Sequence, residues 1–256
     1  MPPVNEQLLE LAEEPGLWLP PEPKLRIERR DGFALVLYGR SAWVHHVRLG
    51  AIEPAVEEVR ALAAAAGIER VSWWIGELTR PHGLAEQLLE LGFEPDDPPE
   101  ETSLTLAVPP RGEPSLPVRR AETFDDIAEA LEIDWSVFGV PEAERAIRRL
   151  ETREAYAALE ASGLVSCYLA ELDGTPVGFG RIVFTPHGGV LMGGATRPEA
   201  RGKGAYVSLV HARWQAAVER GTPRLTVSAG PESTPILTRL GFERIGTVKL
   251  MVQIVD

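Results

Sequence analysis

The chain has 256 residues, of which 44% are hydrophobic and 25% charged, and its formal net charge is −12. This balance is ordinary for globular proteins, and the length accommodates two domains of usual size. The negative charge argues against nucleic acid or an anionic membrane as a partner. The single cysteine, Cys167, excludes an internal disulfide. The N-terminus does not resemble a signal peptide, and no apolar run approaches the roughly 20 residues that span a bilayer, so we expect a cytoplasmic protein.

The first half of the chain combines one short helix with a group of strands. Its predicted elements, in chain order, are a helix at 5–14 and strands at 24–30, 33–39 and 42–49. The dipeptide Asp31-Gly32 between the first two strands is typical of a hairpin turn. An alanine-rich helix and a further strand follow, in which Trp73 and Trp74 are most simply core and interface residues.

A proline-rich stretch at 107–118 lacks periodicity and is interpreted as an interdomain linker. It divides the chain into predicted domains at 1–108 and 117–256. The second half starts with a helical region at about 124–159, broken near Phe138-Gly139-Val140-Pro141. Its predicted strands lie at 166–173, 176–184 and 189–196, and Asp173-Gly174 marks the first turn.

The two halves repeat one another in order. Each contains a helix, a glycine, a strand and a helix that ends in the sequence LGFE. The offset between the copies is 154 at the strand (224 − 70) and 149 at LGFE (242 − 93), so the first copy has five extra residues between strand and helix. Both domains are therefore predicted to be α+β, each with a mixed, mostly antiparallel sheet flanked by helices.

The second copy has a clear helix–strand–helix pattern. Its first helix has an apolar face at Val207, Val210, Trp214, Ala217 and Val218, and Gly221 ends it. Thr234 is predicted to be the N-cap of the next helix, with Pro235 at the first helical position. Ile236, Leu237 and Leu240 are expected to face inward, Gly241 to end the helix, and Phe242 to pack back on it. A strand at 247–254 closes the chain.

The loop between the strand at 189–196 and this amphipathic helix carries the clearest chemistry. It reads Arg201-Gly202-Lys203-Gly204-Ala205-Tyr206. Its two glycines permit close approach and positive φ, the helix start offers unpaired N–H groups, and the two cations add charge. Together these features predict a phosphate site. Tyr206 is expected either to close over a ligand or to pack on the next helix.

The chain lacks a Walker loop, and Val207 stands where a dinucleotide fingerprint requires its third glycine. The loop instead resembles motif A of the GNAT N-acetyltransferase superfamily, R/Q-x-x-G-x-G/A, with Arg201 and Gly204 matching and Tyr206 departing from the small residue usual at the end. The flanking TRPEARG and LTRLGFE also resemble the family, over about residues 117–256.

The resemblance implies that acetyl-CoA, the acyl donor, binds in an opening between two central strands. Its pyrophosphate would lie on Arg201, Gly202, Lys203, Gly204, Ala205 and Tyr206, and its pantetheine arm along Gly194, Ala195 and Thr196. Gly193-Gly194 is expected to form a bulge that aims an amide at the thioester carbonyl. An amine of a small molecule or peptide would then attack directly.

Two features of many family members are missing. The tyrosine expected in the last helix is replaced by Leu237, and the strand before the loop has no titratable group between 190 and 195. Ser233 and Ser228 are candidates to donate a proton or hold a water. The candidate bases are Glu171, Asp134 and His187, of which Glu171, together with Ser233, is taken forward as catalytic.

The first copy is expected to be a degenerate GNAT-like domain that does not bind CoA, because its loop at 47–54 has one glycine and places Glu53 near the phosphate site. No metal is expected, since His45 and His46 point to opposite faces of a strand. A non-catalytic acyl-CoA-binding or sensing protein is the alternative to an acetyltransferase, and a pure interaction protein is a third reading. The sequence leaves monomer and homodimer open.

Overall fold

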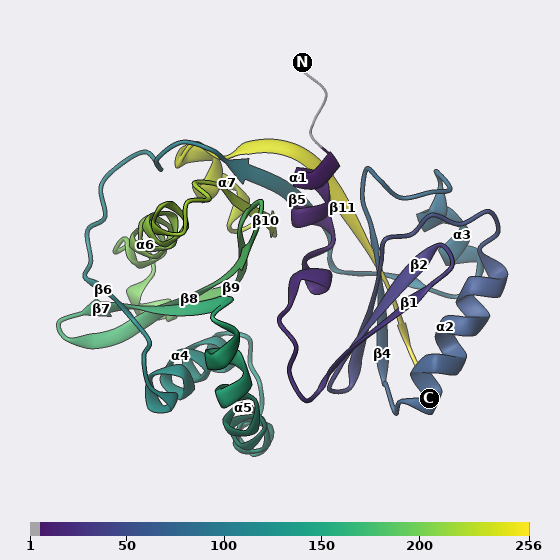
Figure 1. Ribbon diagram of the computed structural model, residues 1–256, viewed down its shortest axis with the longest axis horizontal. Coiled ribbons are helices and arrows are strands. Elements are labelled where there is room, and N and C mark those ends of the chain that lie inside the picture. Colours follow the sequence, from purple (N-terminus) through teal and green to yellow (C-terminus); the bar gives the residue numbers. More distant parts are fainter. Residues whose placement is uncertain (1–5, 256) are drawn as a thin grey trace.

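In the computed structural model, which describes residues 6–255, one eleven-stranded sheet runs through the whole molecule (Figure 1). Its strand order is β1-β2-β3-β4-β11-β5-β10-β9-β8-β7-β6. The strands are β1 Leu25–Arg30, β2 Phe33–Tyr38, β3 Ser41–His45, β4 Arg70–Ile75, β5 Glu94–Leu106, β6 Val118–Arg120, β7 Val165–Leu172, β8 Thr175–Thr185, β9 Gly188–Thr196, β10 Leu225–Ala229 and β11 Glu243–Ile254.

Helices cover both faces of this sheet. They are α1 Glu6–Glu13, α2 Glu53–Ala65, α3 Leu84–Glu90, α4 Phe124–Val137, α5 Glu142–Ser162, α6 Ala205–Glu219 and α7 Thr234–Arg239, with short 3-10 helices η1 Pro15–Trp18 and η2 Pro198–Ala200. The predicted α+β class, with a mostly antiparallel sheet flanked by helices, is confirmed.

The two halves of the chain exchange strands at the middle of the sheet. β5, from the first half, pairs antiparallel with β10 of the second half, and β11, the last strand of the chain, pairs antiparallel with β4 of the first half. β5 and β11 also pair with each other and arch together between the halves in Figure 1. Strand pairing therefore crosses the predicted linker, while the division into domains at 1–108 and 117–256 stays a prediction.

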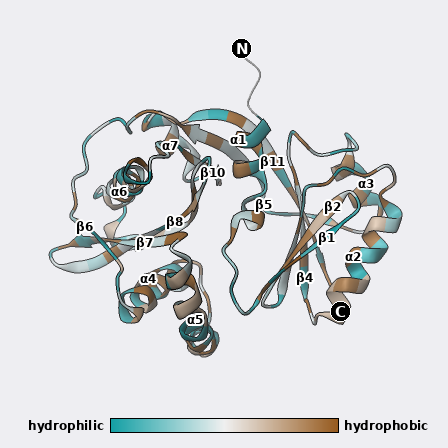
Figure 2. Cartoon of the chain, viewed as in Figure 1, coloured by the Kyte–Doolittle hydropathy of each residue, from teal (hydrophilic) through white to brown (hydrophobic). Residues whose placement is uncertain are grey.

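Separate hydrophobic cores lie under the helices of each half. In the first half, residues of β2, β3 and β4 pack under α2 and α3 around Trp73, which is fully buried. In the second half, α6 and α7 cover one face of the sheet, and α4 covers the other. By contrast, α5 has no buried residue, and much of it is hydrophilic in Figure 2. The central helix α1 places Leu11 against Val183 and Val190 of the second half.

Most local turn and cap predictions are confirmed. Gly32 and Gly174 take positive φ in their hairpins, and Gly221 and Gly241 do so after α6 and α7. Phe242 is buried, and its N–H bonds to the carbonyl of Leu237.

Two predictions for α6 and α7 are wrong. The N-cap of α7 is Ser233 instead of Thr234, because the Thr234 hydroxyl donates back to the carbonyls of Ala229 and Gly230. Val218 is 43% exposed, since the buried face of α6 runs through Arg213 and Ala216.

Candidate cofactor and catalytic site

The sheet opens between β9 and β10. These parallel strands pair only at Gly189 with Leu225 and at Val190 with Thr226. Both strands continue further, β9 to Thr196 and β10 to Ala229, but without pairing to each other. Beyond Val190, the edge of β9 that faces β10 therefore has backbone groups with no strand partner, which an extended ligand can use.

A β-bulge lies on β9 at the level of this opening. Gly180 pairs with Gly194 and Ile182 with Leu191, so Met192 and Gly193 together oppose Arg181. Gly193 has φ +70, which favours glycine at this point. Arg181 Nε donates to the carbonyl of Met192 at 3.2 Å and fixes the strand just before the bulge. The predicted bulge is present, but it consists of Met192 and Gly193, because Gly194 pairs regularly with Gly180.

The next three residues of β9 continue along β8. Gly194, Ala195 and Thr196 pair with Gly180, Phe179 and Gly178. The Thr196 hydroxyl is buried and has no hydrogen-bond partner among residues 6–255. These residues thus lie in the strand that forms one wall of the opening, where the sequence placed them.

The loop after β9 presents a row of free amides. Gly202 and Gly204 have φ +76 and +88, and Gly204 is the N-cap of α6. The N–H groups of Gly202, Gly204, Ala205, Tyr206 and Val207 make no hydrogen bond to any residue within 6–255, whereas Ser208 N–H closes the first helical turn on the carbonyl of Gly204. Unpaired N–H groups at the positive end of a 15-residue helix form an anion-binding geometry.

The charges of the loop are also free. Arg201 and Lys203 are exposed, and neither forms an ion pair within the described chain.

Gly204 has a second role that the sequence did not reveal. A Cβ at Gly204 would lie 1.9 Å from Ser115 Oγ, so the absence of a side chain lets the linker approach the loop. Ser115 Oγ donates to the carbonyl of Lys203, which holds the linker against the loop.

Tyr206 lies on the α6 side of the opening. Its ring approaches β9, since a Cβ at Gly194 would lie 3.8 Å from Tyr206 Cε2. Burial raises the pKa of Tyr206, while Arg213 and Ser233 lower it. Tyr206 therefore packs toward the start of α7 and keeps its proton at neutral pH.

Arg213, which lies further along α6 than Tyr206, is a buried cation that the sequence did not reveal. It is 1% exposed, and its guanidinium lies on the backbone of Gly180, where a Cβ would be 2.9 Å from Cζ. Nε donates to the carbonyl of Leu209 and Nη1 to that of Arg181, but Nη2 has no partner among the described residues. Nothing in the amphipathic pattern of this helix indicated that a charged residue would be buried at this position.

The predicted catalytic residue Ser233 lies at the N-cap of α7. Its hydroxyl donates to the carbonyl of Gly230 at 3.2 Å and interacts with Tyr206. Leu237, which stands where a tyrosine was expected, is fully buried in the core under α6 and α7. The structure thus brings Ser233 and Tyr206 together beside the opening.

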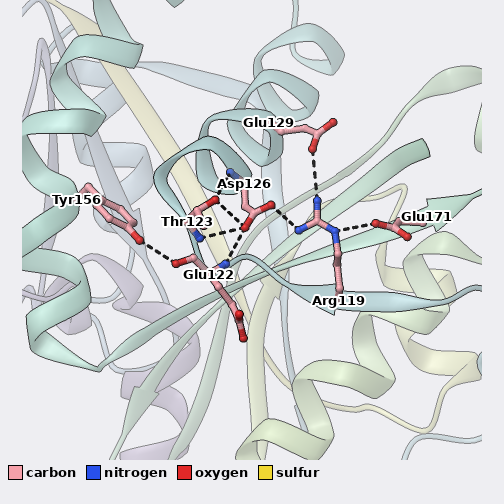
Figure 3. A network of polar contacts seen from close by, with 7 residues as sticks. All are labelled: Arg119, Glu122, Thr123, Asp126, Glu129, Tyr156 and Glu171. Atoms are coloured by element: carbon pink, nitrogen blue, oxygen red, sulfur yellow. Dashed lines mark hydrogen bonds and ion pairs between the residues drawn. The ribbon is translucent and has the colours of Figure 1, made fainter. Parts of the chain in front are cut away.

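Glu171 belongs to a different part of the fold. Its carboxylate accepts from Arg119 Nε at 2.7 Å, and Arg119 also pairs with Asp126 and Glu129 (Figure 3). Asp126 in turn caps the start of α4 together with Thr123. This network ties β6, β7 and α4 to one another, and the structure does not bring Glu171 to the bulge.

Asp134 lies closer to the opening than Glu171 does, on the face of the sheet opposite α6. Asp134, on α4, interacts with Arg181, the residue fixed at the bulge; burial raises the pKa of Asp134, while Arg181 and Arg148 lower it. His187, by contrast, lies in the turn between β8 and β9, at the other end of these strands.

Glu101 was not foreseen, because it belongs to β5 and enters this half through the strand exchange. Its pKa is raised by burial and lowered by Ser228. The Ser228 hydroxyl is buried without a hydrogen bond inside 3.5 Å among the described residues. Ser228 lies two residues beyond the last β9–β10 pair, as Met192 does on the other strand.

Residues 125–242, which contain the opening, the bulge and the loop, match the model of the acetyltransferase (GNAT) family. The second half of the chain is therefore a GNAT domain. A search of curated proteins found no match. The match of this domain to an acetyltransferase family supports transferase activity.

Three similar structures extend over most of the chain. A GCN5-related N-acetyltransferase from Kribbella flavida is 17% identical, with a TM-score of 0.71 over 99% of this chain and 96% of that one. A tandem GNAT protein from the clavulanic acid biosynthesis pathway is 16% identical, with a TM-score of 0.62 over 95% and 87%. A GCN5-related N-acetyltransferase from Sphaerobacter thermophilus is 15% identical, with a TM-score of 0.60 over 88% and 77%. At these identities, the likeness is one of fold.

Within residues 6–255, the chain has no helix long and apolar enough to cross a bilayer. The same residues contain no group of three or more histidine, cysteine, aspartate or glutamate side chains arranged to hold a metal ion. Of the two adjacent histidines, His45 is buried and His46 is exposed and pairs with Glu14.

Proposed function

We propose that this protein transfers an acetyl group from acetyl-CoA to an amine of a small molecule or peptide. The observation that carries the proposal is the row of free amides from Gly202 to Val207 beside the opening of the sheet. Five N–H donors, two unpaired cations and a helix start together favour a diphosphate. The pantetheine arm would then pair with the free edge of β9.

The bulge at Gly193 supports the direct-attack reaction. In this proposal, a backbone N–H at the bulge donates to the thioester carbonyl and stabilises the oxyanion as the amine attacks the carbonyl carbon. The carbon–sulfur bond breaks as the new carbon–nitrogen bond becomes an amide, and the sulfur leaves as a thiolate. Holding the two reactants together accounts for much of the rate, without a covalent enzyme intermediate.

Tyr206 is our candidate for the proton donor to this thiolate. Its phenol approaches Gly194 and interacts with Ser233, and burial keeps it protonated. It would replace the tyrosine that is absent at Leu237. Ser233 then hydrogen-bonds to the tyrosine hydroxyl and does not touch the substrate. This role differs from the one that the sequence suggested for Ser233.

The amine must lose a proton, and two carboxyl groups are suited to accept it. Asp134 and Glu101 both lie on the face opposite α6, and burial raises the pKa of each. A raised pKa makes a carboxylate a better proton acceptor near neutral pH. Glu171, engaged with Arg119, is a less favourable candidate.

The first experiment incubates the protein with acetyl-CoA and a panel of amines and amino-terminal peptides, and measures thiol release. We expect release with at least one acceptor, and none from the Gly202→Asp variant. Binding of CoA by calorimetry separates the alternatives. If CoA binds but no acceptor is acetylated, the non-catalytic CoA-binding function, which the buried Leu237 favours, replaces this proposal.

A further inference from the structure

Two side chains of α6, Arg213 and Tyr206, converge on the same residue of β9. They are seven positions apart (213 − 206), which is about two helical turns, so they share one face of the helix. A Cβ at Gly194 would lie 3.9 Å from Arg213 Nη1 and 3.8 Å from Tyr206 Cε2. Gly194 directly follows the bulge, so the cation and the phenol both lie close to the proposed position of the thioester.

A second glycine makes room for this cation on β8. A Cβ at Gly180 would lie 2.9 Å from Arg213 Cζ, so only a residue without a side chain lets the guanidinium approach the strand this closely. Nη1 donates to the carbonyl of Arg181 at 3.3 Å, and Arg181 is the residue that the two bulge residues together oppose. The positive charge is therefore held at the level of the bulge.

Arg213 has no anion to balance its charge. It is 1% exposed, and its two hydrogen bonds go to backbone carbonyls. The titratable groups that face it are Tyr206 on α6 and Tyr168 and Cys167 on β7. Burial raises the pKa of each of these three groups, so none of them is an anion at neutral pH. Nη2 has no hydrogen-bond partner among residues 6–255.

An unpaired buried cation destabilises a fold, because burial removes the hydration of the charge and no opposite charge replaces it. Many other arginines of this acidic chain, among them Arg119, Arg145 and Arg148, pair with carboxylates. A cation held in this way favours a neighbour that becomes negative during a reaction. In the proposed function that neighbour is Tyr206, since it gives its proton to the sulfur.

We propose that Arg213 is the counter-charge of Tyr206 during acetyl transfer and stabilises the tyrosinate that remains once the phenol has protonated the departing thiolate. The O–H bond of Tyr206 breaks and an S–H bond forms on CoA, so a neutral phenol beside a cation becomes an ion pair. The tyrosinate then regains a proton from water, and the carboxyl group that accepted the proton of the amine releases it to water. Arg213 acts through Tyr206 and is therefore a positioning residue. The inference rests on the proposed function.

The test is a double-mutant cycle on kcat, with Arg213→Met and Tyr206→Phe alone and together. Methionine keeps a long, flexible side chain and removes the charge. Arg213→Met should lower kcat about tenfold and leave KM for acetyl-CoA within about threefold. In the Tyr206→Phe background, the same substitution should lower kcat by less than about twofold, because phenylalanine cannot become an anion. Equal losses in both backgrounds would overturn the inference and leave acetyl transfer intact.

Two more variants separate the charge from the packing. Arg213→Gln keeps a donor for the carbonyl of Arg181 but has no charge, so its kcat should fall as far as that of Arg213→Met. A kcat near that of the unmodified protein would overturn the inference, and this variant also serves if Arg213→Met does not fold. Arg220→Met is the matched control, because it removes a cation from the exposed end of the same helix, where Arg220 lies over the ring of Phe184. It should leave kcat and KM unchanged.

Chemical denaturation adds a measure of stability. Because the charge of Arg213 is buried without a counter-ion, Arg213→Met should unfold at a urea concentration no lower than that for the unmodified protein. A clearly lower midpoint would assign Arg213 to the stability of the fold and overturn its role as a counter-charge. If the unmodified protein acetylates no amine, the proposed function fails and this inference fails with it.

Discussion

The two halves of the molecule contain the same pair of parallel strands, but only one pair opens. In the second half, β9 and β10 share two residue pairs and then separate. In the first half, β3 and β4 share four residue pairs. The segments that follow them stay together, because Arg80 N–H donates to the carbonyl of Val47 and Leu49 N–H donates to the carbonyl of Arg80. A ligand that needs free strand edges can therefore use the second copy, but not the first.

The residues that keep the first copy closed are those that interrupt the repeat. Counting from the equivalent pairs Ala42–Val71 and Gly189–Leu225, His46 falls on Gly193 and also has a positive φ, +53. A positive φ at this position is thus shared by the two copies. The extra residues between β4 and α3 include Arg80, which pairs with the segment Val47 to Leu49 just after β3. A short insertion has closed the opening without altering the strands around it.

The N-terminal segment places two carboxylates beside the first copy, in which the parallel strands stay closed. Glu14 lies beside His46 and Arg48 at 3.4 and 3.7 Å. Glu13 is 3% exposed and is inserted between the backbones of Gly76 and Gly246, where a Cβ would lie 2.0 and 2.6 Å from its oxygens. Acid thus stands beside the closed strands of the first copy, which is consistent with the expectation that the first copy does not bind CoA.

The largest expected effect comes from placing an acid in the open copy. Gly202→Asp adds a carboxylate where a Cβ meets no atom within 4 Å, and aspartate tolerates the positive φ. Repulsion of the pyrophosphate should weaken CoA binding about 100-fold or more, on the order of 3 kcal/mol. Gly50→Asp, in the corresponding loop of the closed copy, is the control and should bind CoA normally. Equal losses in both variants would contradict the difference between the copies.

The second effect concerns the closed copy and depends on pH. Burial raises the pKa of Glu13 from 4.5 to about 7. The folded state therefore holds a proton that the unfolded state has lost between these values, and stability falls as the pH rises through this window, by about 2–3 kcal/mol. Urea unfolding midpoints at pH 5 and pH 8 measure this change. Glu13→Gln should remove most of the difference; an unaltered pH dependence in that variant would assign it to other groups.

Tyr206→Phe tests the proposed proton donor in the open copy. Loss of the hydroxyl should lower kcat about 30-fold and leave KM for acetyl-CoA within about threefold, because the ring still packs beside Gly194. Tyr38→Phe is a control on the surface of the first half, where Tyr38 is 41% exposed. A kcat that survives the loss of Tyr206 would leave the thiolate to depart without a protein acid.

The smallest effect is expected at Glu171. Its contact with Arg119 is partly exposed, so Glu171→Gln should lower the free energy of unfolding by about 1 kcal/mol and change kcat by less than about twofold. Chemical denaturation and steady-state rates separate the two effects. A collapse of kcat with normal stability would restore Glu171 to the catalytic role that the sequence suggested.

Local structure was largely predictable because it depends on neighbours in the chain. The hairpins at Asp31-Gly32 and Asp173-Gly174, the helix ends at Gly221 and Gly241 and the bulge at Gly193 all follow from what glycine permits. β5 was harder to foresee, because its first part contains Pro95, Pro98 and Pro99, which are unusual inside a sheet. Its place between β10 and β11 depends on partners more than a hundred residues away.

The sequence by itself determined the repeat, the α+β class and a loop rich in glycine and positive charge, since each is set by spacing and residue type over a short stretch. Only the tertiary structure decided which copy opens and that β5 pairs with the second half while β11 pairs with the first. It also decided that Glu101 and Arg213 lie beside the opening. The physical reason is that strand pairing and burial join residues distant in the chain, and local patterns carry no record of those partners.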